Sequence, residues 1–339
     1  MKNQNKETAD MEQRRMEARI AREKACIDKR ILYNNKWKVG SVWKDDARVM
    51  LDKYLVKNTL WSSIPLNENA SIFFNNDPTI DKLFALFLDS FDAMPYHPDF
   101  AFDIIWRVYE ASLVNYGRNW KPCPDGTHVL ITKASNDIVD SLANHEALLK
   151  DLIEDYLCNI PLSLLRFMFA RMYYERELGV SEQLTLIQAR CKAVLGEMYE
   201  LIKEKYNVGQ GVVTAADQRN AAILLGKIFR GEDIVLGNPQ TTFKALTLKH
   251  RVELLINGII FTSRCERFHG DVPSPFKSSL NTSLSRYQTY YYLAASTTLF
   301  YYCVLFKEAA NSGIEIFSIQ DLSRVLEEIR EQISNMYHD

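Results

Sequence analysis

One stretch of the chain decides the fold: Leu254-Leu255-Ile256-Asn257-Gly258-Ile259-Ile260-Phe261, followed closely by Arg264-Cys265-Glu266-Arg267-Phe268-His269-Gly270. Its first half is apolar on almost every side of a helix, which predicts a helix buried among other helices. We expect this helix to span about 242–269. It should stop there because Gly270 suits the left-handed position after a helix and Pro273 prevents the helix from resuming.

The composition also favours helices. The chain has 339 residues, of which 47% are hydrophobic and 25% charged, the balance of a globular protein. Its 13 Gly and 10 Pro are few for a β-sandwich or barrel, which needs frequent turns. Apolar residues at helical spacing predict further helices at about 45–61, 79–93, 99–117, 135–158, 161–178, 181–206, 215–230, 283–311 and 318–336, with 62–78 as a loop. The predicted fold is an all-α helical bundle.

The same pattern divides the chain into three parts. Residues 1–38 are expected to form a polar helical arm, either solvated or lying on a nucleic acid or a membrane surface. Residues 39–179 predict a helical domain of unknown role. Gly179 ends a helix and Ser181 suits the N-cap of the next one, so a second helical domain is expected over 180–339.

Charge limits the kinds of partner. A net charge of −2 excludes a generally basic coat, so any nucleic acid must be held by a local patch. Residues 241–290 contain seven Lys or Arg and three Asp or Glu, a net charge of +4. This segment is either such a patch or a solvated face with i,i+4 pairs such as Lys249 and Glu253.

Cysteine usage and hydropathy bear on the compartment. The six cysteines lack the paired spacing of a disulfide framework or a zinc site, which fits a reducing compartment. The N-terminus has no apolar core of a secretory signal, and no apolar run reaches the ~18 residues of a membrane span. We therefore expect a cytoplasmic protein without membrane association, bound metal or cofactor.

Arg264 and His269 are the candidate catalytic residues. They lie about 140° apart on an ideal helix, so the histidine is expected to fold back towards the arginine where the helix ends. Such a pair suits chemistry on a phosphodiester, which needs an acid, a base and positive charge on the phosphorane. A histidine with a pKa of about 6.5 serves either proton transfer, and an arginine binds phosphate oxygens through two donors without losing its charge.

This arrangement resembles the HEPN superfamily, whose signature is an arginine, four to six residues and a histidine at the end of a buried helix. The motif reads Arg264-Cys265-Glu266-Arg267-Phe268-His269 here, and Gly270, a Pro-bearing loop and a long apolar helix follow it. The resemblance covers about 180–339 and implies a bundle of four or five helices. Many active members have Asn, Asp or His directly after the arginine, where this chain has Cys265.

The resemblance also implies a function. Many HEPN domains are metal-independent endoribonucleases that cleave RNA through 2′-hydroxyl attack, and two copies of the motif form one composite site in a homodimer. The resemblance further suggests a toxin or antiviral defence role, with a regulatory protein as a second kind of partner.

Two other residues are candidates for substrate binding. Asn257 lies two turns before Arg264 and either orients the arginine or belongs to a hydrogen-bond network in the core. Arg267 either holds a flanking phosphate or forms a salt bridge. The tyrosines of the helix expected at 283–311 either stack on bases or pack in the core or a dimer interface.

The alternative function is not enzymatic. The chain would then be a non-catalytic HEPN-like helical module for binding protein or RNA. Under that interpretation Arg264 makes a structural contact, and it should pair with a carboxylate such as Glu253 or Asp271.

Overall fold

The computed structural model describes residues 63–94, 96–116, 127–145, 147–173, 182–208, 213–268 and 284–335, with scattered positions between 13 and 28. The chain divides into two compact units. Unit 1 is Met1–Asn58 with Ser274–Arg286, and unit 2 is Thr59–Pro273 with Tyr287–Asp339. The described positions between 13 and 28 are helical. The rest of the arm predicted over 1–38 and the helix predicted at 45–61 lie outside the described residues.

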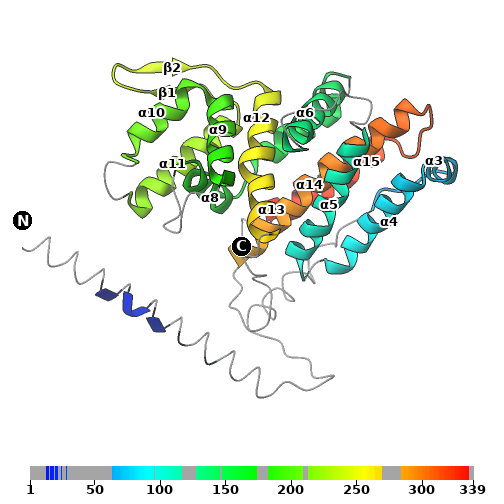
Figure 1. The fold of residues 1–339 in the computed structure, drawn as a ribbon, viewed down its shortest axis with the longest axis horizontal. Helices are drawn as coiled ribbons and strands as arrows, with labels where there is room; N and C mark the ends of the chain where they lie inside the picture. Colours follow the sequence, from blue (N-terminus) through cyan, green and yellow to red (C-terminus); the bar gives the residue numbers. More distant parts are fainter. Residues whose placement is uncertain are drawn as a thin grey trace, which may run out of the picture. The chain divides into compact units, whose positions relative to one another are not determined.

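The described part of the chain is all-α, as predicted (Figure 1). Its helices are α3 (Ala70–Asn76), α4 (Pro78–Ala93), α5 (Pro98–Tyr116), α6 (Thr127–His145), α7 (Ala147–Cys158), α8 (Leu162–Tyr173), α9 (Glu182–Leu195), α10 (Glu197–Lys205), α11 (Ala215–Phe229), α12 (Leu248–Leu255), η2 (Ile256–Ile260, a π-helical turn), α13 (Phe261–Phe268), α14 (Leu284–Asn311) and α15 (Ile319–Asn335). A small antiparallel sheet joins β1 (Ile234–Leu236) to β2 (Thr241–Phe243), with Ile234 opposite Phe243. Within the described ranges, no helix has the length and apolar character needed to cross a membrane.

Capping side chains explain where several helices begin. The carboxylate of Asp77 accepts from the backbone N–H groups of the next turn, and Pro78 takes the first position of α4. Thr214 and Asp217 form a capping box, which starts α11 at the predicted residue. Ser318 caps the last helix near its predicted start, since its Oγ accepts from the backbone N–H of Asp321 at 3.1 Å.

Some predicted boundaries were wrong, and local features explain two of them. The helix predicted at 181–206 is broken between α9 and α10 at Gly196, whose φ of 56° a side chain would make unfavourable. The helix predicted at 135–158 is likewise two helices, α6 and α7. The predicted central helix begins at Leu248, because 241–243 pairs in the small sheet and Thr247 caps the helix. The loop predicted at 62–78 contains α3.

Helices from both sides of residue 179 pack together in unit 2. α8 contacts α9, and α12 contacts both α6 and α7. α15, near the end of the chain, also packs on α7. The boundary expected between 39–179 and 180–339 therefore lies inside one compact unit.

α14 is the most enclosed helix, and every residue of 291–305 is buried. Its polar groups have partners on the surrounding helices: the Tyr292 hydroxyl donates to the carbonyl of Tyr156 on α7 at 2.8 Å, and the Tyr291 hydroxyl bonds Gln332 on α15. Most of the tyrosines considered for base stacking are thus core residues: Tyr287, Tyr291, Tyr292, Tyr301 and Tyr302.

α12, η2 and α13 form one continuous helix that contains the π-helical turn. The N–H of Phe261 reaches the carbonyl of Ile256, five residues back, and the Thr262 hydroxyl donates to the carbonyl of Asn257 at 2.8 Å. A π turn holds an extra residue compared with an α-helical turn. η2 packs against α8 and α9, and a Cβ added at Gly258 would lie 2.8 Å from Met168 Cε and 3.4 Å from Cys191 Sγ. Gly258 thus permits the close approach of these two helices.

We predict that Gly258→Val lowers the free energy of unfolding by about 2 kcal/mol, because it forces extra carbons into the fully buried space around Met168. Urea denaturation followed by circular dichroism measures the change. Met168→Ala should relieve the crowding, so the double variant should be more stable than the sum of the two single effects. Simple additivity would contradict this account.

Candidate functional site

Arg264 lies on α13 and reaches a carboxylate of α5. Its Nη2 donates to Glu110 Oε2 at 3.2 Å, and the Trp106 indole donates to the same oxygen at 3.2 Å. The Arg264 side chain is 23% exposed, and within the described residues its Nε has no hydrogen-bond partner. The pair is therefore held by a single hydrogen bond, unlike a bidentate arginine–carboxylate pair.

Arg267 is held very differently. Its Nε and Nη2 donate to Asp103 at 2.8 and 2.6 Å, and Nη2 also donates to Asp99 at 3.2 Å. The guanidinium is 6% exposed and lies over the Tyr290 ring. Burial opposes its charge, but the bonds and charges of Asp103 and Asp99 outweigh this and raise the pKa of Arg267. These contacts favour the salt-bridge interpretation of Arg267 over a contact with phosphate.

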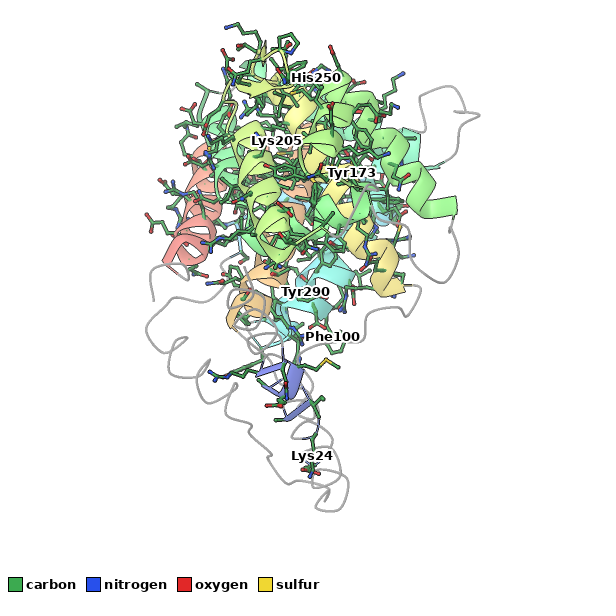
Figure 2. All side chains as sticks on the ribbon, turned by 90° about the vertical axis from the view of Figure 1, so that its left-hand side faces the viewer. Lys24, Phe100, Tyr173, Lys205, His250 and Tyr290 are labelled. Atoms are coloured by element: carbon green, nitrogen blue, oxygen red, sulfur yellow. The ribbon has the colours of Figure 1, made fainter. Side chains whose placement is uncertain are left out.

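The buried ion pair ties the end of α13 to α5 and α14. Figure 2 labels Tyr290 and Phe100, which mark this end of α14 and α5, and His250, which lies towards the other end of the α12–α13 helix. A second tie joins Glu266 to Arg171 of α8 by an ion pair. The backbone that carries Arg264 is thus fixed from two sides.

Arginines and phenylalanines alternate around Arg264. In space the order is Arg190, Phe261, Arg264, Phe268 and Arg107, and each guanidinium carbon lies 4.7–5.9 Å from the centre of a neighbouring ring. We call these five residues the arginine–phenylalanine ladder. Its arginines come from α5, α9 and α13. Arginine beside aromatic rings suits both phosphate groups and the faces of bases, so the ladder is a candidate nucleic-acid surface.

Cys265, directly after the motif arginine, is buried. Burial raises the pKa of its thiol, and the nearby positive charges of Arg264 and Arg190 oppose this only in part. A thiol with a raised pKa is neutral near pH 7 and a poor nucleophile. We therefore assign Cys265 a packing role in the protein interior next to Arg264.

Asn257 lies on η2 and is buried. Its Oδ1 accepts a hydrogen bond from Thr132 of α6 at 2.8 Å, and the residue lines a pocket between helices. On an ideal helix it would share a face with Arg264, but the extra residue of the π turn shifts the relation by about 100°. Asn257 therefore belongs to the hydrogen bonds of the core and to the pocket.

His269 follows α13 directly and lies outside the described residues. Of the predicted site residues, the structure places Arg264 in the ladder, Arg267 in a buried ion pair and Asn257 in the pocket. The described ranges contain no group of three or more His, Cys, Asp or Glu suited to hold a metal ion. Arg264 with its neighbours can hold an anion, and a proton transfer there needs His269.

Sequence reasoning missed Glu110, Arg107 and Arg190. Glu110 and Arg107 lie three residues apart on α5, a spacing that places them on one side of that helix. Arg190 comes from α9. Nothing in the sequence shows that these helices meet at α13, because the contacts span more than seventy residues of chain.

We predict that Asp103→Asn and Glu110→Gln differ strongly in their effect on stability. Asp103→Asn removes one partner of a buried pair and should lower the free energy of unfolding by about 3 kcal/mol. Glu110→Gln breaks a partly exposed single bond and should cost less than about 1 kcal/mol. Urea denaturation of both variants measures the difference, and equal losses would show that Arg264 is as firmly held as Arg267.

Comparison with known proteins does not assign a function to these residues. No family model, no curated protein and no solved structure matches the chain. The resemblance to the HEPN superfamily therefore rests on the motif from Arg264 to His269 and on its place at the end of the α12–α13 helix.

Proposed function

We propose that this protein is a metal-independent endoribonuclease of HEPN type, with Arg264 and His269 as its catalytic residues. One observation carries the proposal: the motif arginine keeps its carboxylate partner through a single hydrogen bond. It does so on a partly exposed surface, between two phenylalanine rings and directly before the motif histidine. Arg267, three residues further, is buried and donates three hydrogen bonds to Asp99 and Asp103.

The proposed reaction needs no bound group. The 2′-oxygen of the RNA attacks the neighbouring phosphorus, the 2′-hydroxyl gives up its proton, and the bond to the 5′-oxygen breaks as that oxygen gains a proton. A histidine supplies either proton transfer, and Arg264 binds the charged non-bridging oxygens of the phosphorane. The products are a 2′,3′-cyclic phosphate and a free 5′-hydroxyl. DNA lacks the attacking group and is not a substrate.

In this proposal Glu110 sets the resting position of Arg264. A phosphate that enters the ladder competes with the carboxylate for the guanidinium. Because the Arg264–Glu110 contact is a single, partly exposed bond, the exchange costs little. The carboxylate also repels phosphate, so its removal should strengthen RNA binding.

The wider setting is part of the same proposal. Two copies of the chain would supply two histidines, one for each proton transfer, so we propose a homodimer. The cysteines among the described residues are free, which supports a reducing, cytoplasmic environment: Cys158, Cys191, Cys265 and Cys303. A toxin or antiviral defence role, with a regulatory protein partner, follows from the HEPN resemblance alone.

A specific observation also favours the second candidate, a non-catalytic helical module for protein or RNA binding. That interpretation requires Arg264 to pair with a carboxylate, and Arg264 does pair with one, Glu110 on α5, where Glu253 or Asp271 was expected. In this case the contact is structural, and replacing Glu110 should weaken the packing of α13 on α5 without strengthening RNA binding.

We predict that the purified chain cleaves single-stranded RNA in EDTA and leaves the matching DNA intact. His269→Ala and Arg264→Ala should each lower the rate by about 10²–10⁴-fold. The measurement is cleavage of end-labelled oligonucleotides, with the cyclic phosphate identified by mass spectrometry. Arg166→Gln, an exposed arginine on α8, is the matched control and should cleave normally.

Glu110→Gln separates the two candidates. A nuclease in which Glu110 only holds Arg264 at rest should keep its activity and bind RNA more tightly. Equal weak cleavage by all variants would identify a contaminant. Absence of cleavage for varied RNAs, combined with RNA binding that ignores Arg264→Ala, would contradict the nuclease proposal.

A further inference from the structure

A pocket of about 340 Å³ lies where α6, α9 and the α12–η2 helix meet. Figure 1 shows α12 between α9 and α6, and α12 contacts both of these helices. The volume is at the lower end of the range for small-molecule sites. Polar and charged side chains line it, so an occupant would be a polar molecule.

Arg190 is the reason to expect a ligand. It lines the pocket from α9 and lies 4.9 Å above the Phe261 ring, and its Nη1 is buried with no hydrogen-bond partner among the described residues. Two other enclosed arginines have two bonds to one carboxylate: Arg251 with Glu154 and Arg267 with Asp103. Arg190 has no such partner in the described part of the chain, and burial lowers its pKa. A guanidinium held in this way lacks the anion that would compensate its desolvation.

Two buried amides supply the specificity. Asn136 on α6 is 5% exposed and lines the pocket, and its Oδ1 has no hydrogen-bond partner within the described ranges. Asn257 is 4% exposed, and the bond from Thr132 to its Oδ1 leaves the amide nitrogen as a donor. The pocket thus offers an acceptor and a donor beside the unpaired charge. Buried amide groups without partners are rare in folded proteins, which makes Asn136 informative.

The remaining charges narrow the choice of ligand. Lys249 lines the pocket but is paired with Asp140 at 3.4 Å on a solvated edge. Lys133 also lines the pocket, as do Asp137 and Glu253. Their carboxylates oppose a bare multivalent anion and accept hydrogen bonds from N–H or O–H groups. The pocket therefore suits an organic molecule with one anionic group and several donors.

We propose that this pocket binds a small organic anion, whose phosphate or carboxylate group pairs with Arg190 and whose N–H or O–H groups bind Asn136, Asp137 and Glu253. An occupant would contact the ladder at Arg190, which packs on the same Phe261 ring as Arg264. The pocket needs no RNA cleavage, and its occupancy is measured independently of the proposed nuclease activity.

Isothermal titration calorimetry of the full chain tests the proposal with two probes, AMP for the phosphate class and L-glutamate for the carboxylate class. Adenosine and inorganic phosphate serve as incomplete ligands. We expect one of the two probes to bind at least tenfold more tightly than either incomplete ligand. Binding of inorganic phosphate as tight as that of AMP would overturn the two-part recognition, as would the absence of binding by both probes at about 1 mM.

Two variants assign the binding to the pocket. Arg190→Gln removes the charge, and Asn136→Asp keeps the side-chain shape while placing a carboxylate in the pocket that Arg190 lines. Each should weaken binding at least tenfold. Arg166→Gln, outside the pocket, should bind like the original chain. Circular dichroism and thermal unfolding verify the fold; if Arg190→Gln is unfolded, Asn136→Asp decides. Unchanged binding in a folded variant would place the ligand elsewhere and overturn the proposal.

Discussion

The buried ion pair between Arg267 and Asp103, reinforced by Asp99, is the interaction on which the candidate site depends. Two charges inside a protein are stable only when their hydrogen bonds are satisfied, so this pair tolerates little movement of α13 relative to α5. The same restriction fixes the backbone of Arg264, which lies three residues earlier on α13. A guanidinium held by a single hydrogen bond keeps a defined position only if the backbone beneath it is fixed by other residues.

The charged residues of α13 thus have two different roles, which the composition of the helix alone would not distinguish. Arg267 and Glu266 join neighbouring helices, whereas Arg264 stays on a partly exposed surface with a single carboxylate partner. The ladder then connects this surface to the pocket below it, because Phe261 contacts both Arg264 and Arg190. The proposed nuclease site and the proposed ligand pocket are therefore two ends of one row of cations and rings, although each is argued from its own contacts.

The fold class was readable from the sequence because long apolar runs, few glycines and clear caps all agree on helices. The start of α11 was predicted to the residue, and the structure shows that Thr214 and Asp217 cap the helix there. Helix ends inside apolar runs were not readable, since Gly196 looks like any tolerated glycine until its positive φ is known. The partner of Arg264 was also missed: Glu110 is 154 residues away, and only the packing of α5 on α13 brings them together. Arg264 was singled out by its local motif, and its catalytic role stays a prediction, as does that of His269.

The π-helical turn limits which mutations this segment can accept during evolution. An extra residue in a helix turns everything after it by about 100°, so η2 sets the angle between the half that lines the pocket and the half that carries Arg264. Substitutions in η2 keep that angle, but loss of one residue would restore a regular helix and point Arg264 away from α5. Related chains that retain the ladder should therefore vary in side chains here and not in length. The spacing from Glu253 to Arg264 is then a stricter signature than any one residue between them.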